Sequence, residues 1–522
     1  MDFNVKNLVL CVFLGVILTN CARESDSAGS LLSDEILREH VSYFNQMEEE
    51  GIVNHISNAE SADWLSNNVP LFEAPDSTIE QIYYFRWWTF RKHIKQTPAG
   101  FVLTEFIRPV GHDGNFNTIS SALGHHLYEG RWLTDPSYMD QYTNFWLIWE
   151  DYAEDADLHK YSQWTADAIY KRYLVNKDQG FVTALLNELD KDYLQWKREK
   201  QLPNEMYWQY DVRDAMEESI SGSRTDKNAR PTINSYMYGN AKAIAKIAGM
   251  IGIDSLQSVY TQRAERLKQQ VHENLWDAEE SFFKVLHPNG KLDGAREAIG
   301  FIPWYFGLPE DSATYGKAWQ QLRDPEGFDA PMGLTTAERR HPEFRTAGVG
   351  TSEWDGAVWP FATTQTLKGL ARLLKYYENH DMTEHDFFDE LKTYAGAHEK
   401  YGRPYIGEYH DEVNGKWLHG DNPRSIYYNH SGFADLIISD LVGIRPRADE
   451  TLEVKPLIPE GEWDWFALDN VNYHGRELTI AWDRDGSKYN RGPGFQIWVD
   501  GERIHQSESI ESVNVPLPAS GM

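Results

Sequence analysis

The sequence predicts a mainly α-helical protein that ends in a small β domain. Segments with apolar residues three to four positions apart recur between residues 78 and 443, which is typical of amphipathic helices. After Gly443 the pattern changes to an alternation of apolar and polar residues, which is typical of strands. A chain of 522 residues is long enough for one large domain and one or two smaller modules.

The N-terminus has the pattern of an export signal. An apolar run at residues 8–18 follows one early lysine, and it is too short to be a stable membrane anchor. The string LTNC at residues 18–21 resembles a bacterial lipobox, although asparagine replaces the usual small residue before the cysteine. We therefore expect a signal peptide over residues 1–20, lipidation of Cys21 and an exported lipoprotein of the bacterial periplasm or outer membrane. The mature chain would have no internal disulfide, because Cys11 lies in the signal.

The middle of the chain is predicted to be one helical domain with a short leader. Residues 21–77 are expected to form a tether and a helical leader that packs on the main domain. The main domain is predicted over residues 78–443, where the stretches 235–252 and 361–377 have clear helical periodicity. Long loops rich in glycine, proline, tryptophan and charged residues separate the helices, as at residues 341–360. Loops of this length within a compact domain are usually functional.

The C-terminal segment has the pattern of a β module. The stretches TLEVKPLIP (451–459), GRELTIAWD (475–483) and GFQIWVDG (494–501) alternate apolar with polar residues and are bounded by glycine, aspartate and asparagine. The sequence therefore predicts a β-sandwich-like accessory domain over residues 444–522.

Composition and charge restrict the partners of the protein. Aromatic residues make up 13% of the chain, including 19 Trp and 28 Tyr, and flat rings either fill cores or bind the apolar faces of sugars. Eighty acidic against 50 basic residues give a net charge of −30, which repels nucleic acids and anionic membrane surfaces. We expect no nucleic-acid partner, and a substrate that is neutral or that binds in a locally cationic pocket.

Two segments combine aromatic and cationic residues in a way that is compatible with sugar binding. They are residues 82–94 and residues 112–135. In the second segment, His125, His126 and Glu129 also suggest a metal site, but adjacent histidines point to different sides of a helix and no HExxH spacing is present. The sequence therefore predicts no metal and no cofactor. The candidate substrate-binding residues in these segments are Arg86, Trp87, His125, Arg131 and Trp132.

The string DAMEESISG at residues 214–222 contains two adjacent glutamates, Glu217 and Glu218. Adjacent glutamates on a helix surface are usually solvated, but these precede a helix whose first turn has Arg230 and Asn234, both candidate substrate ligands. Burial in a crowded, partly apolar pocket raises the pKa of a carboxyl group, which is the condition for a general acid near neutral pH. The string therefore indicates a candidate proton donor.

A second carboxylate lies in a second aromatic loop, over residues 401–433. Glu408 is next to Tyr409 and His410 and precedes a turn that ends at Gly415. Hydrolysis of a glycosidic bond uses two carboxyl groups, one to protonate the departing oxygen and one to activate water from the opposite face. Glu408 is therefore the candidate base.

The order of three loops resembles a known family. The loops are AMEES at residues 215–219, WDGAVWP at 354–360 and GEYHDEVNG at 407–415. In this order along a helical domain they resemble (α/α)6-barrel glycosidases of the mannosylglycerate hydrolase type, which are related to glycoside hydrolase family 63 and to trehalases. The resemblance covers roughly residues 80–443 and implies a toroid of six helical hairpins, while the C-terminal module is similar to accessory domains of such barrels.

The resemblance also implies roles for the two glutamates. Glu408 matches the general base of these families, and Glu217 stands where their acid, an aspartate, is found. The implied activity is that of an inverting O-glycosyl hydrolase that is exo-acting on α-linked oligosaccharides in extracytoplasmic glycan degradation. Its two carboxyl groups would be on the order of 6.5 to 9.5 Å apart. The alternatives for the acid are Asp214, Glu218 and Asp226, and the loop 354–360 adds Trp354, Asp355 and Trp359 to the substrate-binding candidates.

The sequence leaves two other functions open. A polysaccharide lyase on a helical toroid would abstract a proton next to a uronate carboxylate. A non-catalytic surface lipoprotein would instead capture glycans on its aromatic residues. The residues available to a lyase are Arg86, His93, His125 and Tyr236.

Overall fold

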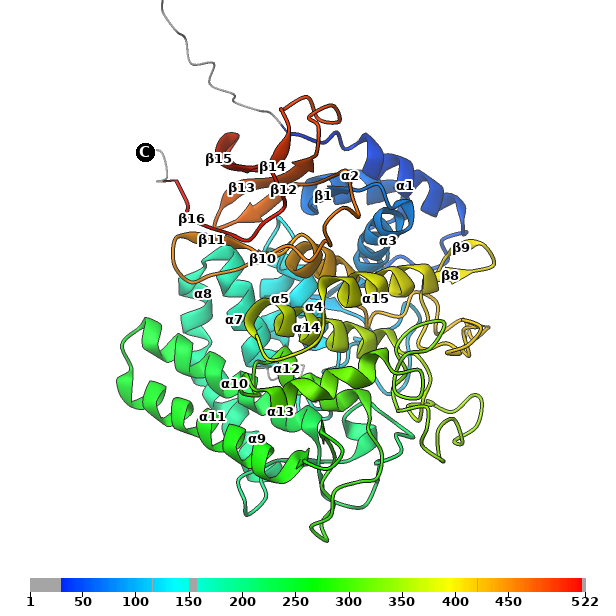
Figure 1. Cartoon of the computed structure of the whole chain (residues 1–522), viewed down its shortest axis with the longest axis vertical. Coiled ribbons are helices and arrows are strands. Elements are labelled where there is room, and N and C mark those ends of the chain that lie inside the picture. Colours follow the sequence, from blue (N-terminus) through cyan, green and yellow to red (C-terminus); the bar gives the residue numbers. More distant parts are fainter. Residues whose placement is uncertain (1–29, 115, 150–156, 420, 519–522) are drawn as a thin grey trace, which may run out of the picture.

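The computed structural model describes residues 30–114, 116–149, 157–419 and 421–518, so the predicted signal peptide and Cys21 lie outside the described residues. The fold is an α/α toroid with a small C-terminal β domain, as the sequence predicts. Figure 1 shows the sheets at one end of the molecule beside the N-terminal helices, with the helical body below them. Within the described part of the chain, no helix is both long and apolar enough to cross a membrane.

The N-terminal leader contacts both the helical body and the C-terminal sheet. Its first helix buries Phe44, whose ring lies against Phe85 and Trp88 of the helical body. Its strand β1 pairs antiparallel with β12 of the C-terminal domain, with Phe72 opposite Leu468. The leader therefore holds the two parts of the chain together. Its elements are α1 (Glu35–Gln46), α2 (Asn58–Asn68) and β1 (Leu71–Glu73).

A closed ring of helices forms the centre of the helical body. Along the described chain, each ring helix contacts the next one, in the order α4, α7, α10, α12 and α14. Helix α14 then contacts the π-helix that continues α16, and α16 contacts α4, which closes the ring. The ring helices are α4 (Leu123–Gly130), α7 (Thr165–Asn176), α10 (Pro231–Met250), α12 (Ile302–Tyr305), α14 (Pro360–Tyr376), and α16 (Phe433–Asp435) with the π-helix Leu436–Leu441.

Two ring helices agree closely with the sequence periodicity. The stretches 235–252 and 361–377 predict helices, and they lie in α10 and α14. Each of these helices starts with proline, whose fixed φ and missing N–H suit the first helical position. Arg230 and Trp359 are the preceding N-cap residues, so the sequence places both side chains at the same end of the ring.

The remaining helices surround the ring. Helix α3 is buried on nearly all sides, and the segment 82–94, expected to be a turn or helix start, is mostly its C-terminal part. The outer elements are α3 (Ser77–His93), α5 (Ser137–Leu147), α8 (Gln179–Ala184), α9 (Leu186–Lys200), α11 (Asp254–Leu275), α13 (Ala313–Gly316) and α15 (Glu384–Ala397). Short hairpins join them: β2 (Ile94–Thr97) with β3 (Gly100–Leu103), β4 (Trp208–Gln209) with β5 (Asn228–Ala229), β6 (Trp276–Asp277) with β7 (Phe282–Phe283), and β8 (Glu399–Lys400) with β9 (Arg403–Pro404).

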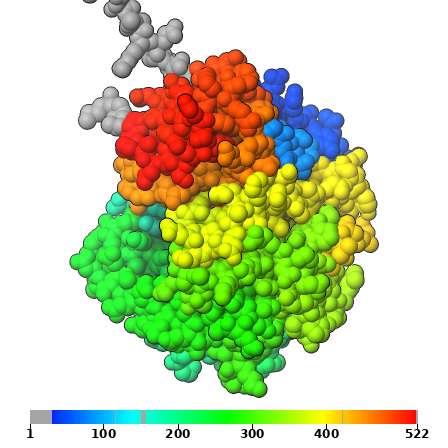
Figure 2. All heavy atoms as spheres, viewed as in Figure 1, coloured from blue at the N-terminus to red at the C-terminus, as the bar shows by residue number. Residues whose placement is uncertain are grey.

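The C-terminal domain consists of two sheets. One sheet has the strand order β1-β12-β13-β14-β15, and the other has the order β10-β11-β16. Figure 2 shows this domain as a lobe on top of the helical body, in contact with the N-terminal leader. The predicted strands at 451–459, 475–483 and 494–501 contain β11, β13 and β14. The strands are β10 (Ile444–Arg445), β11 (Thr451–Val454), β12 (Trp465–Tyr473), β13 (Arg476–Asp483), β14 (Gly494–Val499), β15 (Glu502–Ser507) and β16 (Val513–Pro516).

Candidate active site

Loops that precede the ring helices bring three glutamates into one site. Glu105 follows β3, Glu217 follows a 3-10 helix (Asp211–Arg213), and Glu408 follows β9. The charges of both Glu217 and Glu408 contribute to raising the pKa of Glu105 and that of Tyr428. Glu217 and Glu408 therefore both lie near Glu105 and Tyr428.

Glu408 is held in its ionised form. It is buried at 7% exposure, and it accepts hydrogen bonds from Ser425 Oγ at 2.5 Å and from Arg424 at 3.0 Å. His419 Nδ1 lies 3.4 Å from the same carboxylate. Burial alone would raise the pKa of Glu408, but the hydrogen bonds from His419 and Ser425 and the charge of Arg424 outweigh it, so the pKa is lowered. A carboxylate of this kind can accept a proton at neutral pH.

Glu217 has the opposite electrostatic setting. Burial raises its pKa to about 7, and the charge of Asp211 acts in the same direction. The cations nearby, Arg224 and His112, lower the pKa only in part. A substantial fraction of Glu217 is therefore protonated at neutral pH and can donate a proton.

The backbone around Glu217 is sharply turned. Ala215 has φ +57° and Glu218 has φ +67°, both in the left-handed region that residues with a Cβ rarely adopt. The backbone N–H of Trp354 bonds to the carbonyl oxygen of Glu217 at 3.4 Å, which ties this turn to the tryptophan loop. The turn directs Glu217 and Glu218 to different surroundings, one half-buried and one exposed.

The three alternatives for the acid are placed less suitably. Asp214 is fully buried and is paired with Arg230 at 2.6 Å, and it also accepts a hydrogen bond from Ser162 at 2.5 Å. Glu218 is exposed and paired with Arg224 at 2.8 Å, and Asp226 is exposed. Among the four carboxyl groups, Glu217 is thus the one that is both half-buried and without a cation in direct contact in the described chain.

Arg230 forms hydrogen bonds to the loop that contains Glu217. Its guanidinium donates to Asp214, and it reaches Ser221 at 3.4 Å and Ser219 at 3.3 Å. Because Arg230 is itself at the start of α10, these bonds fix the 214–221 loop to the ring. The predicted candidate Arg230 therefore positions the acid loop.

A stack of three aromatic rings joins the acid loop to the base loop. Trp354 and Trp359 stack with ring centroids 4.6 Å apart, and Trp359 stacks on Tyr409 at 4.6 Å. Trp354 bonds to the backbone of Glu217, while Tyr409 is the residue after Glu408. The stack therefore sets the relative position of the two carboxyl groups.

Asp355, which lies between the two tryptophans in sequence, holds the loop. Its carboxylate accepts a hydrogen bond from the N–H of Ala347 at 2.7 Å, and its carbonyl oxygen accepts one from the N–H of Arg345 at 3.0 Å. These bonds close the segment 345–355 on itself, so the position has a clear structural role.

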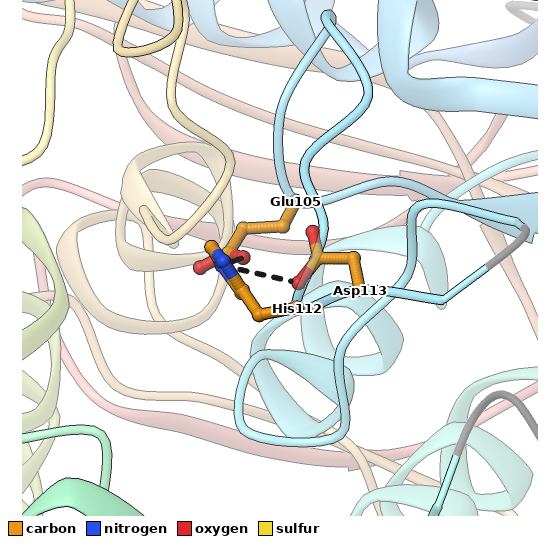
Figure 3. A group of neighbouring side chains, drawn as sticks. All are labelled: Glu105, His112 and Asp113. Carbon is orange, nitrogen blue, oxygen red and sulfur yellow. Dashed lines mark hydrogen bonds and ion pairs between the residues drawn. The ribbon is translucent and has the colours of Figure 1, made fainter.

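A second carboxyl pair, which no sequence motif predicts, lies next to the site (Figure 3). Glu105 and Asp113 are both buried, and His112 Nε2 is 3.1 Å from Glu105 and 3.3 Å from Asp113. Burial raises the pKa of Glu105 to about 8 and that of Asp113 to about 9; the charges of Glu408 and Glu217 add to the first shift, and the charge of Glu105 adds to the second. Neighbouring buried carboxyls of this kind share a proton at neutral pH.

The same three side chains could hold a divalent metal ion. Their ligand atoms all lie within 4.8 Å of one another, and two carboxylates with an imidazole form a common ligand set. The histidines weighed in the sequence do not converge in this way, because His126 bonds to Tyr142 and to the carbonyl of Asn429. That the enzyme needs no metal or cofactor stays a prediction.

Six of the predicted substrate-binding residues have side chains that contact other residues inside the protein. Their side chains are buried and engaged in the framework that supports the ring. Their contact with substrate stays a prediction. Arg86 pairs with Glu129, Trp87 is in the core, His125 lies between Trp164 and Phe361, Arg131 and Trp132 bond to Asp435, and Asn234 bonds to Tyr207.

The ring of helices and the carboxyl groups in its loops agree with a glycoside hydrolase domain. The chain belongs to the mannosylglycerate hydrolase MGH1-like glycoside hydrolase family, whose sequence model matches residues 115–431. Residues 444–506 match the C-terminal domain of glycosyl hydrolase family 65. The chain therefore contains a glycoside hydrolase domain followed by a C-terminal domain of the family 65 type.

Solved structures agree with this assignment. A protein described as a sialidase is 46% identical with a TM-score of 0.91, over 94% of this chain and 46% of that one, so the chain spans about half the length of that relative. A family 78 rhamnosidase of Bacillus sp. GL1 has a TM-score of 0.55 at 12% identity, over 79% of this chain and 40% of that chain. The α-L-rhamnosidase from Dictyoglumus thermophilum has a TM-score of 0.54 at 11% identity, over 86% and 50% of the chains. The two rhamnosidases share the fold.

Family membership favours a hydrolase over the two alternative functions. Two of the residues available to a lyase, His93 and Tyr236, are engaged inside the protein. His93 lies between Thr104 Oγ1 and the carbonyl of Tyr427 at 2.9 and 2.7 Å. The family model that matches the chain is that of a glycoside hydrolase.

Proposed function

We propose that this enzyme hydrolyses a terminal glycosidic bond with inversion, with Glu217 as general acid and Glu408 as general base. The observation that carries the proposal is the opposite pKa shift of two carboxyl groups whose loops are joined by the stack of Trp354, Trp359 and Tyr409. Pairs of groups whose surroundings drive their pKa values apart supply the acid and the base of such reactions.

The reaction follows from these two protonation states. Glu217 transfers its proton to the glycosidic oxygen as the bond from that oxygen to the anomeric carbon breaks. Glu408 accepts a proton from a water molecule, whose oxygen forms the new bond to the anomeric carbon from the opposite face. The electron pair of the broken bond stays with the departing oxygen, and the product has the inverted configuration.

The residues around Glu408 support its role as a base that acts through water. Ser425, Arg424 and His419 all contact its carboxylate, so its charge is stabilised before the reaction starts. This arrangement suits a proton acceptor. It makes the carboxylate a weaker nucleophile, which favours inversion over a covalent intermediate.

Exo action and an extracytoplasmic location belong to the same proposal. Exo action is supported by the long loops 214–221, 345–355 and 401–430, which contain Glu217 and Glu408 or bond to the backbone of Glu217. The location is supported by the N-terminal sequence with its candidate lipidation site at Cys21. The preference for α linkages stays a prediction.

The proposal is tested with aryl glycosides of both anomeric series, and the panel includes a sialoside because one relative carries that name. The purified protein, Glu217→Gln and Glu408→Gln are compared, with Glu218→Gln as the matched control next to the acid. We expect both site variants to lose activity and the control to keep it. Full activity in Glu408→Gln, or in Glu217→Gln with a substrate whose departing oxygen needs a proton, would remove that residue from the mechanism.

A further inference from the structure

A second cavity lies away from the three glutamates, toward the other end of the ring helices. Its volume is about 570 Å³, within the range of small-molecule sites. It is lined by Leu174 near the end of α7, by Tyr376 at the end of α14, and by the segment 445–449 that enters the C-terminal domain. Figure 2 shows a hollow on this face, where the helical body meets the C-terminal lobe.

The lining of this cavity is strongly basic. Three acidic residues line it, namely Asp440, Asp449 and Glu453. A cationic cavity is unusual in a chain whose net charge is −30. The basic residues that line it are Arg131, Lys171, Lys368, Arg372, Arg445 and Arg447.

Four of these six cations have carboxylate partners. Arg131 and Lys368 pair with Asp435, and Lys368 and Arg445 reach Asp440. The fourth is Arg447, which pairs with Asp449 and Glu453. These ion pairs account for four of the six cations, and Lys171 and Arg372 remain.

Lys171 and Arg372 form no ion pair with any carboxylate in the described ranges. The Nε atom of Arg372 is buried and has no hydrogen-bond partner there. The guanidinium passes over Gly307, where a Cβ would stand 2.5 Å from Nε, so the chain leaves room for this side chain. Two cations that form no ion pair within the described ranges thus share one cavity.

Helix dipoles do not account for these two charges. Cations in the last turn of a helix are stabilised by its dipole. The last turn of α7 contains no basic residue and that of α14 contains Lys375, so Lys171 and Arg372 both lie before the last turn. Asp167 compensates part of the charge of Lys171 without pairing with it, and no carboxylate pairs with Arg372 in the described chain.

A smaller adjoining cavity extends the same surface. Its volume is about 210 Å³, and it shares Lys171, Arg372, Tyr170 and Tyr305 with the first. It adds Lys242, whose Nζ lies 3.3 Å from a tyrosine hydroxyl and has no ion pair among the described side chains. Burial lowers the pKa of Lys171 and that of Lys242 to about 8, and the charge of Arg372 adds to both shifts, while the charge of Asp167, which also lines the smaller cavity, opposes them.

Aromatic rings accompany the cations. Tyr170 and Tyr305 line both cavities, and flat rings bind the apolar faces of sugars while their hydroxyls remain able to bond. Cations with planar or point charge bind phosphate, sulfate and carboxylate groups. The lining thus combines features for a charged group with features for a sugar ring.

We propose that this cavity binds a small anionic ligand of monosaccharide size, with its oxyanion group between Lys171 and Arg372. The shared chemistry is the oxyanion, which either a free phosphate or a sugar acid supplies. The site is separate from the glutamates, and the proposal does not depend on the catalytic mechanism. Because residues 445–449 and helices α7 and α14 all line the cavity, the ligand would connect the ring to the C-terminal domain.

Isothermal titration calorimetry of the whole protein tests the proposal. The probes are inorganic phosphate, glucose 6-phosphate and D-glucuronate, with glucose as the neutral control. We expect heat with the anions and none with glucose. Tighter binding of glucose 6-phosphate or glucuronate than of phosphate identifies a sugar-bound anion, and tighter binding of phosphate identifies a free one.

Variants locate the binding. Lys171→Met and Arg372→Met should each weaken anion binding by about tenfold or more, because each removes a charge-assisted bond. Arg372→Lys should keep part of the affinity, and Lys317→Met, at an exposed position outside the cavity lining, should leave it unchanged. Glycosidase activity should stay within about twofold in all of them, since none of these residues contacts the catalytic glutamates.

Thermal unfolding gives a second measurement that does not rely on activity. The anion should raise the Tm of the wild-type protein, and the rise should be absent in Lys171→Met. Folding of the variants is itself expected, because removing an unpaired buried cation relieves a penalty. No heat and no Tm change with any of the three anions, or equal responses in wild type and Lys171→Met, would overturn the proposal.

Discussion

The loops around Glu217 and Glu408 differ in their neighbours more than in their residue type. Three polar groups contact Glu408 directly, and its pKa is lowered in spite of burial. No cation contacts Glu217 within the described chain, and burial raises its pKa to about 7. The comparison teaches that the two roles are assigned by the partners that each loop supplies, because the side chains themselves are identical.

The largest effect is expected when the base is removed. Glu408→Gln keeps the shape of the side chain but cannot accept a proton, so kcat should fall by about 10⁴-fold. Initial rates with one aryl glycoside measure this, with Glu218→Gln as the control. A loss below about tenfold would mean that another group activates the water.

Removing the acid should have an effect that depends on the leaving group. Glu217→Gln should lower kcat/KM by about 10³-fold for a disaccharide, whose departing oxygen needs a proton. The loss should be much smaller for a dinitrophenyl glycoside, which departs without protonation. An equal loss for both substrates would contradict the role of Glu217 as proton donor.

The pH profile should follow the two pKa values separately. Glu217 must be protonated, so activity should fall as the pH rises above about 7. Glu408 must be ionised, so activity should fall as the pH drops through its lowered pKa. Arg424→Met removes a charge that lowers that pKa, so the acidic limb should move to higher pH by about one unit while the basic limb stays. A shift of the basic limb instead would reverse the assignment.

The carboxyl pair beside the site gives a smaller effect. Asparagine resembles a protonated aspartate, so Asp113→Asn should keep activity within about threefold if Glu105 and Asp113 share a proton. Activity should also survive dialysis against EDTA. A metal held by Glu105, His112 and Asp113 would instead make both treatments strongly inhibitory, and added divalent ions would restore only the dialysed protein.

The smallest effect concerns the backbone of the acid loop. Ala215 has φ +57°, a conformation that glycine adopts more easily. Ala215→Gly should therefore raise the free energy of unfolding by about 0.5 kcal/mol, the relief of strain minus the added freedom of the unfolded chain. Urea unfolding measures this, and Ala313→Gly, in the exposed helix α13, should be destabilising. Destabilisation by Ala215→Gly would show that the turn is not strained.

Much of the fold could be predicted because the patterns are local. Apolar spacing located α10 and α14, and alternation located β11, β13 and β14. The pairing of β1 with β12 could not be predicted, since the two strands are distant in sequence and no local signal connects them. Helix α3 was not recognised as a long helix, because a helix that is buried on nearly all sides has no polar face and so no clear helical periodicity.

The site was predicted less completely than the fold. Glu217 and Glu408 stand out through their loops, but Glu105 lies in a short segment after a hairpin and carries no motif. Arg86 and Trp132 show why aromatic and cationic crowding is ambiguous, because such groups also build a buried framework of ion pairs and rings. Ser425 and Arg424 contact Glu408 only in the folded protein, so no spacing in the sequence predicts these contacts.

The configuration of the first product tests the central assignment most directly. Proton NMR recorded during the first minutes of hydrolysis, before mutarotation, identifies the anomer that the enzyme releases. With Glu408 acting through water, the released sugar should have the anomeric configuration opposite to that of the substrate. Release of the retained anomer would show that Glu408 attacks the sugar itself, and would contradict its assignment as a general base.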